Sequence, residues 1–341
     1  MQSLRTALRA LTLSLFAALP AAAQGLDLTI NHVGLGIGDV PRVTGLRLNY
    51  RDRRLERVDG VNATIWTPYD NGGNGVVRGV ALGVPVTGAA RIDGVALGVF
   101  GVGARERIRG IGVGALGVGA NELDGLMVGG LGAGTGADFT GIGVGGLGVG
   151  AGGSLRGIFV GGLGAGSGQD VTGLVIGGLG VGSGGSVKGI LVGGLGVGAA
   201  KEVRGIAIGG LGVGAGEGLT GLAIGGVGVG TGGTLRGVGI GGIGVGGQTV
   251  RGLAIAGFGA GGRDVRGALI AAGWNRLEHG TLRGVTVSSF NQMKGVQHGL
   301  AIGIVNYAEE LHGLQIGLIN IARNNSSGTR VLPVANWHGG N

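Results

Sequence analysis

Residues 141–250 read GIGVGGLGVGAGGSLR, GIFVGGLGAGSGQDVT, GLVIGGLGVGSGGSVK, GILVGGLGVGAAKEVR, GIAIGGLGVGAGEGLT, GLAIGGVGVGTGGTLR and GVGIGGIGVGGQTV. One sixteen-residue unit recurs there almost without change. A fixed period in this range indicates an architecture of stacked repeats, in which no unit is stable alone. The fold of the whole chain therefore depends on what one such unit does.

The repeat extends well beyond this stretch. A glycine opens each unit, and most units start fifteen or sixteen residues after the previous one, with one step of seventeen and a last step of fourteen. No linker interrupts them, so we expect about sixteen coils in a single domain. The opening glycines are Gly79, Gly94, Gly110, Gly125, Gly141, Gly157, Gly173, Gly189, Gly205, Gly221, Gly237, Gly252, Gly267, Gly284, Gly299 and Gly313.

The spacing of aliphatic residues within residues 156–171 predicts two short strands for each unit. Ile158 and Val160 alternate with other residues, as in a strand. The interval from Val160 to Leu163 is three, so one straight strand would turn its second half to the opposite face. A corner at Gly161-Gly162 removes this conflict. The side chains expected inside the coil are then Ile158, Val160, Leu163, Ala165 and Val171.

This logic predicts an all-β, single-domain β-solenoid with a period of 15–16 residues, in which coils stack at about 4.8 Å. The outward positions would be apolar on the first strand and bare backbone on the second, at Gly164 and Gly166 and their equivalents. We interpret such an exterior as a packing face for another copy, another protein or a membrane; a tolerant, drifting repeat explains it equally well. The expected outward apolar residues are Met127, Phe159, Val175, Leu191, Ala207, Ala223 and Ala254.

Composition excludes several other classes. Glycine makes up 91 of 341 residues, but without the triplet period and proline content of collagen. The glycine is interleaved with aliphatic residues, and 43% of the chain is hydrophobic, which is too apolar for a disordered linker. There is no cysteine, so disulfides, thiol catalysis and thiolate metal sites are excluded.

We divide the chain into four segments. Residues 1–23 have the pattern of a secretory signal peptide, with Arg5 and Arg9 before a short apolar run and small residues at the end, so we expect the mature chain to begin at Gln24. Residues 24–75 form N-terminal strands or a cap, with a loop at Pro68 and residues 70–75. Residues 76–283 are the glycine-rich coils, and residues 284–341 are terminal coils with a C-terminal cap.

The net charge of +8 includes one basic cluster, Arg47 to Arg57. Such a cluster suits anionic partners, or it belongs to a solvated edge or capping coil, which is the interpretation that we prefer. The cluster contains Arg47, Arg51, Arg53, Arg54 and Arg57.

Basic residues also precede many repeat glycines. They alternate with Asp or Thr, and this alternation relieves the repulsion between like charges over most of the ladder. These positions are Arg78, Asp93, Arg109, Asp124, Thr140, Arg156, Thr172, Lys188, Arg204, Thr220, Arg236, Arg251 and Arg266.

The C-terminal units replace glycine in the second strand with Asn. We expect the asparagines to stack as an amide ladder at equivalent turn positions; they are Asn275, Asn291, Asn306 and Asn320. Residues 299–306 and 313–320 resemble a family of bacterial surface-repeat proteins built on Gly-Leu-Gln-Ile-Gly-Leu-x-Asn units, and residues 330–336 resemble that family's ending. The resemblance covers residues 284–337 and implies an exported or surface-associated bacterial protein without implying a reaction.

A search for chemistry-bearing residues finds little. Gly-x-Gly-x-x-Gly matches occur, for example at Gly148, Gly150 and Gly153, but another repeat follows instead of the helix that a nucleotide site needs. Gly166 and its equivalents stand where a calcium-binding β-roll needs Asp. His298 and His312 precede consecutive repeat glycines with Glu310 nearby, an arrangement that suits a weak zinc pair or, preferably, a surface ladder. We therefore assign no catalytic, cofactor-binding or metal-binding residue and expect no cofactor.

The sequence predicts a non-catalytic structural or interaction protein, exported to the bacterial envelope or surface. It would associate with itself or with envelope components through its glycine-rich and apolar faces, with no nucleic-acid partner, and its ligand is unassigned. Membrane association is open. An outer-membrane β-barrel is the first alternative, disfavoured by the three-residue slip and by only three Trp and three Tyr. A surface binder of polysaccharide or ice is the second.

Overall fold

The computed structural model describes residues 25–66 and 74–339. All regular secondary structure in these residues is β-strand. The predicted signal peptide and Gln24 lie outside the described residues, and so does most of the predicted loop at residues 68–75. The chain divides into two compact units, one of residues 1–136 with 140–142 and one of residues 137–139 with 143–341.

The first unit is built from parallel coils with one antiparallel strand at its N-terminal end. Strands β2 to β7 pair in parallel, each with the next along the chain. Strand β1 instead pairs antiparallel with β2 through a turn at Asn31 and His32, both with positive φ, and so covers an edge that would otherwise be open. The strands are β1 (Gly25–Ile30), β2 (Val33–Gly38), β3 (Arg42–Asn49), β4 (Arg57–Thr64), β5 (Val76–Gly83), β6 (Val86–Gly98), β7 (Gly101–Gly114), β8 (Gly117–Ala120), β9 (Glu122–Gly129) and β10 (Gly132–Thr135).

The second unit contains the most regular coils. Its strands are β11 (Phe139–Gly145), which has residues in both units, β12 (Gly148–Ala151), β13 (Leu155–Gly161), β14 (Gly164–Ser167), β15 (Val171–Gly177), β16 (Gly180–Ser183), β17 (Val187–Gly193), β18 (Gly196–Ala199), β19 (Glu202–Gly209), β20 (Gly212–Ala215), β21 (Gly218–Gly225), β22 (Gly228–Thr231), β23 (Thr234–Gly241), β24 (Gly244–Gly246), β25 (Thr249–Ala256), β26 (Gly259–Gly262), β27 (Asp264–Ala271), β28 (Trp274–Val287), β29 (Phe290–Ile302), β30 (Val305–Ala322) and β31 (Val331–His338).

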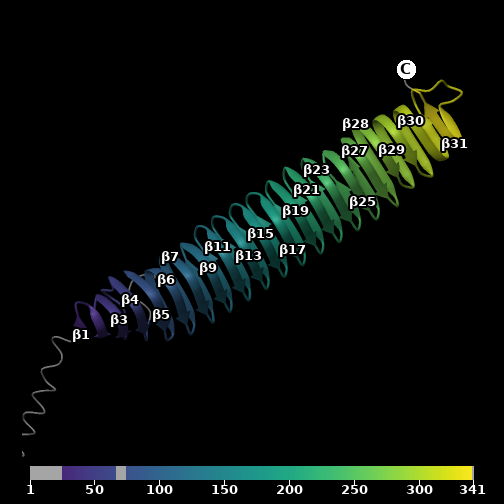
Figure 1. Ribbon diagram of the computed structural model, residues 1–341. Helices are drawn as coiled ribbons and strands as arrows, with labels where there is room; N and C mark the ends of the chain where they lie inside the picture. Colours follow the sequence, from purple (N-terminus) through teal and green to yellow (C-terminus); the bar gives the residue numbers. More distant parts are fainter. Residues whose placement is uncertain (1–24, 67–73, 340–341) are drawn as a thin grey trace, which may run out of the picture. The chain divides into compact units, whose positions relative to one another are not determined.

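Each regular coil of the second unit consists of one seven- or eight-residue strand and one strand of three or four residues. The longer strands β13, β15 and β17 follow one another along the stack (Figure 1). Strand β13 pairs in parallel with β15, and the shorter strand β14 pairs in parallel with β16, in both cases with a register shift of sixteen residues. The same pattern continues along the unit, so equivalent residues of consecutive coils are neighbours. Antiparallel β31 pairs with β30 at the C-terminal end. Both units thus have the predicted β-solenoid architecture.

The predicted corner at Gly161-Gly162 is confirmed. Strand β13 ends at Gly161, and β14 begins at Gly164. A Cβ atom on Gly162 would lie 1.8 Å from the carbonyl oxygen of Gly146, the equivalent corner residue of the preceding coil. Because no side chain fits there, the corner requires glycine.

The predicted facing of the longer strand is wrong. Phe159 is fully buried, whereas Ile158 is 44% exposed and Leu163 is 49% exposed. Val160 is also exposed. The buried side chains are those of Leu155, Phe159, Ala165 and then Val171 of the next coil, so Ala165 and Val171 lie inside as predicted. The coil that begins at Leu155 therefore contributes three side chains to the core rather than five.

The reason for this facing is the charge that precedes the repeat glycine. Arg156, Ile158 and Val160 share one side of β13. Turning the two aliphatic side chains inward would bury the Arg156 guanidinium, which costs far more free energy than leaving two aliphatic side chains half exposed. Leu155 and Phe159 lie on the other side of the strand and fill the core instead. The expected outward residues Met127, Phe159, Val175, Leu191, Ala207, Ala223 and Ala254 are likewise all buried.

Large and small residues compensate for one another inside the core. Gly143 occupies the slot equivalent to Phe159, and a Cβ atom there would lie 2.7–2.8 Å from the rings of Phe139 and Phe159. These two rings pack edge to face, with centroids 4.8 Å apart and an interplanar angle of 70°. The glycine thus leaves the space that the two aromatic rings fill, as close packing requires.

The repeat glycines form a ladder of close backbone contacts. Gly189 has φ +131°, and a Cβ atom there would lie 2.0 Å from the carbonyl oxygen of Gly173. The φ angle and the contact each exclude an L-amino-acid side chain. Gly198 on the shorter strand of the same coil differs, because a Cβ atom there would meet nothing within 4 Å. Two kinds of glycine therefore coexist in one coil, one required by the backbone and one not.

Gly189→Ala is predicted to destabilise the second unit by roughly 1–3 kcal/mol or more, since it adds a strained φ and a clash with Gly173. Gly198→Ala serves as the matched control and should leave stability unchanged or raise it by about 0.4–1 kcal/mol. Urea unfolding of both variants measures the difference. Equal losses of stability would contradict the distinction between the two glycines.

Candidate interaction surface

The outer side of the longer strands in the second unit is an array of aliphatic side chains. Each strand carries two of them on its outer side, one and three residues after the repeat glycine, where they are half-buried or exposed, and the corner adds a third that is exposed. We call this array, from β13 to β27, the aliphatic face. Its rows are Ile158, Leu174, Ile190, Ile206, Leu222, Val238, Leu253 and Ala268; Val160, Ile176, Val192, Ile208, Ile224, Ile240, Ile255 and Ile270; and the corner residues Leu163, Leu179, Leu195, Leu211, Val227, Ile243 and Phe258.

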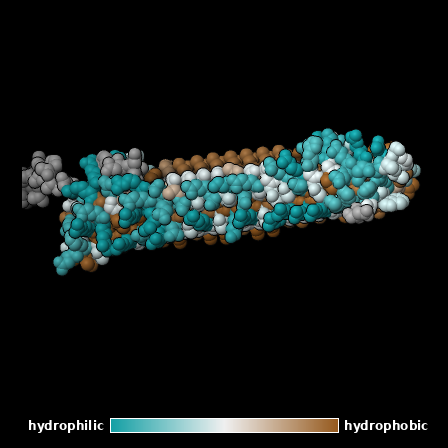
Figure 2. Space-filling model, turned by 90° about the horizontal axis from the view of Figure 1, so that it is seen from above, coloured by the Kyte–Doolittle hydropathy of each residue, from teal (hydrophilic) through white to brown (hydrophobic). Residues whose placement is uncertain are grey.

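Backbone hydrogen bonds hold the corner residues in line. The Leu195 N–H donates to the Leu179 carbonyl oxygen at 2.6 Å, and the Leu211 N–H donates to the Leu195 carbonyl oxygen at 2.6 Å. Their side chains are about half exposed, at 50% for Leu195 and 54% for Leu211. Hydrophobic side chains form a regular row along one margin of the coils in Figure 2, in keeping with this register.

The prediction of an apolar exterior is therefore right in kind but wrong in its residues. The outer rows are made by the positions of Ile158, Val160 and Leu163, which were expected in the core, and the position of Phe159, which was expected outside, lies in the core. A contiguous exposed apolar surface of this extent is unusual in a monomeric protein and often marks an interaction site. The aliphatic face is accordingly the strongest candidate for a functional surface.

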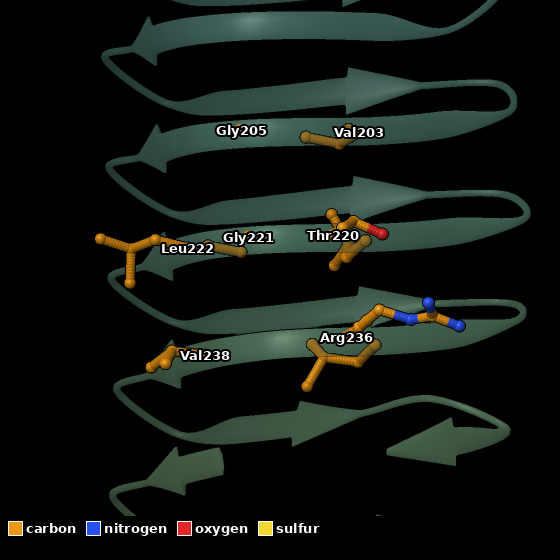
Figure 3. A pocket seen from close by; sticks show the side chains of 10 residues that line it. Val203, Gly205, Thr220, Gly221, Leu222, Arg236 and Val238 are labelled. Carbon is orange, nitrogen blue, oxygen red and sulfur yellow. The ribbon is translucent and has the colours of Figure 1, made fainter. Parts of the chain in front are cut away.

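A row of basic residues borders the aliphatic face in the last regular coils. Arg236, Arg251, Arg266 and Arg283 each precede a repeat glycine and are direct neighbours in the parallel register. All four are exposed, and within the described residues none of their guanidinium groups forms an ion pair. Figure 3 shows how this position lies on the strand: Thr220 and Arg236 are at one side, and Leu222 and Val238 are toward the other. We call these four arginines the basic row.

In the first unit, the residues that precede the repeat glycines balance one another's charges. Asp59, Arg78, Asp93, Arg109 and Asp124 alternate in charge in the parallel register. Arg109 Nε lies 3.3 Å from Asp124 Oδ2. The predicted relief of repulsion by alternation is thus confirmed in the first unit, and it does not extend to the basic row, where like charges are adjacent.

One depression lies on the longer strands of the second unit. Its lining includes Thr220, Leu222, Arg236 and Val238 (Figure 3). It is a shallow hollow between neighbouring side chains and not a cavity that encloses a small molecule. The surface therefore suits a broad partner better than a small ligand.

The shorter strands present almost bare backbone. Gly164 and Gly166 flank the buried Ala165, as predicted for outward positions. A Cβ atom on Gly182, Gly198, Gly214 or Gly230 would meet nothing within 4 Å, so the fold itself does not require glycine there. The structure gives no steric reason within the chain for these glycines.

The asparagines of the terminal coils form the predicted amide ladder, but at a different place. Asn275, Asn291, Asn306 and Asn320 occupy the inward slot of the shorter strand rather than a turn, and all are fully buried. Asn291 Nδ2 donates to Asn306 Oδ1 at 2.8 Å, and Asn306 Nδ2 donates to Asn320 Oδ1 at 2.8 Å. Upstream coils hold Val or Ala in this slot, so the ladder replaces aliphatic packing with hydrogen bonds and is structural.

The two predicted histidines lie one ladder step apart. The rings of His298 and His312 stack with centroids 5.0 Å apart, and His338 of β31 meets His312 edge to face at 5.6 Å. His312 Nε2 is 2.8 Å from Glu310 Oε1. Within the described residues no group of three or more acidic, His or Cys side chains is arranged to hold a metal ion.

The N-terminal basic cluster is not a solvated edge at Arg47. This side chain is fully buried, and its guanidinium contacts Asp52 and lies 3.1 Å from Asp39 Oδ1. It also donates to Asn62 Oδ1 at 2.8 Å. Arg54 pairs with Asp39 at 3.3 Å, and Arg57 pairs with Asp59 at 2.7 Å. Asp39 and Asp52 lie only eight and five residues from Arg47, but the alternation of the sequence does not show that the Arg47 side chain points into the coil and is enclosed there with them and with Asn62 of the next coil.

One carboxyl at the turns has a shifted pKa. The Ser154 backbone N–H donates to Asp138 Oδ1 at 2.8 Å and lowers the pKa of Asp138, with a further contribution from Arg156. The bond stabilises the fold above the unfolded carboxyl pKa of about 3.9, and this contribution is lost as the pH falls through the lower folded value. Two coils later, Asp170 Oδ1 accepts the same 2.8 Å bond from the Ser186 N–H.

Comparisons with known proteins do not assign a function to this chain, so the function is inferred from the surfaces described above. No protein-family model, no curated protein and no solved structure matches the chain. In the described part of the chain, no helix has the length and hydrophobicity to cross a membrane.

Arg47→Met is predicted to destabilise the first unit by about 3–5 kcal/mol, because Asp39 and Asp52 would lose the cation that balances them in a buried setting. Arg57→Met, which removes an exposed ion pair, should cost no more than about 1 kcal/mol. Guanidinium unfolding of the two variants tests this difference. A small loss for Arg47→Met would show that the buried network is not needed for stability.

Asn306→Val is predicted to destabilise the terminal coils by about 1–3 kcal/mol, because Asn291 and Asn320 each lose a hydrogen-bond partner in a buried site. Adding Asn291→Val should cost less than it does alone, since its partner has already gone. Urea unfolding of the single and double variants measures this coupling. Strictly additive losses would contradict a cooperative ladder.

Proposed function

We propose that this protein is a non-catalytic structural or interaction protein of the bacterial cell envelope, and that it acts through the outer rows of its coils. The observation that carries the proposal is the aliphatic face. Its corner row alone runs in register from Leu163 to Phe258. Full burial of an exposed side chain of this size contributes roughly 1.5–3 kcal/mol, so covering each of these half-exposed side chains would contribute about half as much. Covering such a surface with a partner removes apolar side chains from water, which contributes favourable free energy to binding.

The geometry also supports a scaffold role. Equivalent residues recur at a spacing of about 4.8 Å along the stack, so any contact made by one coil can be repeated by the next. Many weak, identical contacts then add to a strong attachment. A repeat built in this way suits a partner that is itself extended or repetitive.

The envelope location is supported by sequence features. Residues 1–23 have the pattern of a secretory signal, and residues 284–337 resemble bacterial surface-repeat proteins. The absence of cysteine is compatible with an oxidising compartment, since there is no thiol to oxidise. The proposal therefore places the mature chain outside the cytoplasm.

Cell fractionation with N-terminal sequencing tests this function. We expect the mature protein to begin at Gln24 and to be found with the envelope or outside the cell, and surface proteolysis of intact cells would separate an external from a periplasmic location. A cytoplasmic enzyme measured in the same fractions serves as the control. Recovery of the chain in the cytoplasm with Met1 intact would overturn the proposal.

A further inference from the structure

The aliphatic face and the basic row lie on the same strands of the second unit. On β25, Arg251, Leu253 and Ile255 all project from the outer side, and Arg266 with Ile270 repeats the arrangement on β27. The charged positions lie at one margin, and the aliphatic rows extend from there to the corner at Ile243. The outer side of this sheet is therefore amphipathic across the strand and constant along the stack.

The positive charge of this margin is uncompensated. Residues 236–283 contain six arginines and two acidic residues, Asp264 and Glu278. Asp264 Oδ1 accepts from the Thr281 backbone N–H at 3.1 Å, and Glu278 pairs with Arg276 at 2.9 Å. Neither acid pairs with the basic row. Like charges at adjacent ladder positions repel one another, so this row favours an external anion.

The combination of charge and apolar surface narrows the class of partner. A soluble polyanion would neutralise Arg251 and Arg266 but leave the aliphatic rows in water. An apolar protein surface would cover those rows but bury the arginines without partners, which is costly. A lipid surface with anionic headgroups supplies both components, because phosphate oxygens accept from guanidinium and the acyl boundary receives aliphatic side chains.

We propose that the second unit docks through this amphipathic face on a membrane surface that contains anionic lipid. The basic row contacts headgroup phosphates, and the aliphatic rows lie at the boundary between headgroups and acyl chains. Long arginine side chains can reach the headgroups while their methylene groups lie along apolar surface. This inference rests on the proposed function and names its partner.

Vesicle cosedimentation of the mature chain tests the charge requirement. The probes are vesicles of phosphatidylglycerol and phosphatidylcholine in equal parts, and vesicles of phosphatidylcholine alone. Binding should be strong only to the anionic vesicles and should weaken at high salt. R251Q/R266Q should weaken it by about 25-fold, on the basis of about fivefold for each basic residue near an anionic surface. R78Q/R109Q removes the same charge from the alternating ladder of the first unit and should change binding less than about twofold.

A second pair of measurements tests the apolar requirement. L211S/I243S changes two half-exposed corner residues and should weaken vesicle binding by about tenfold or more, since both lose apolar contact. The same variant should bind dextran sulfate, a soluble polyanion, as the parent protein does. Circular dichroism and urea unfolding confirm that each variant retains its fold, which is expected because all six substituted positions are exposed.

Three results would overturn the inference. The first is equal binding of the protein to both kinds of vesicle, and the second is an equal loss of vesicle binding in R251Q/R266Q and R78Q/R109Q. The third is binding to dextran sulfate as tight as to vesicles, together with unchanged affinity of L211S/I243S for both ligands. The last would identify a soluble polyanion as the partner. These assays use purified protein, so they are independent of cell fractionation. Envelope location without vesicle binding would reject lipid docking alone, and vesicle binding by a cytoplasmic protein would reject the proposed location alone.

Discussion

The close approach of consecutive repeat glycines is the constraint on which the coil geometry depends. From Gly79 to Gly299 each repeat glycine has a positive φ, and its missing side chain leaves room for the carbonyl oxygen of the preceding glycine, as between Gly189 and Gly173. No other residue combines this φ with this contact. Once these glycines are aligned, the register of the whole coil is set, and every other position becomes a row.

Because the register is fixed, the same kind of side chain recurs at the same position of consecutive coils and forms a continuous row. An aliphatic residue at one outward position becomes a continuous apolar row, and a charge becomes a line of charges about 4.8 Å apart. In the first unit Arg and Asp alternate along this line, as at Arg109 and Asp124, so neighbouring charges attract one another. The second unit places Arg251 beside Arg266 and leaves the repulsion to be balanced from outside. The difference between these two ladders is what gives the second unit a distinctive outer surface.

The inward position of the shorter strand is filled by two different types of residue in different parts of the chain. In the glycine-rich coils the inward position of the shorter strand holds Val or Ala, such as Val197. In the terminal coils it holds Asn, whose amides donate and accept along the ladder from Asn291 to Asn320. From Asn291 to Asn320 neighbouring coils carry the same residue type, so each of these amides hydrogen-bonds to an amide of an adjacent coil. Arg47 shows the same rule for a charge, since carboxylates from other segments surround it.

The sequence by itself determined the β-solenoid, its period, the Gly161-Gly162 corner and the amide ladder. All of these follow from local spacing and from the repetition of residue types. It did not determine which side of the longer strand faces the core, because alternation alone fits either assignment and glycine occupies many of the informative positions. The stacked structure decided this: Arg156 shares its side with Ile158, so that side stays outside and Phe159 is buried. The tertiary structure also decided that Arg47 points inward to Asp39 and Asp52. It set aliphatic rows beside an unbalanced line of arginines, because neighbours in different coils exist only once the coils are stacked in register.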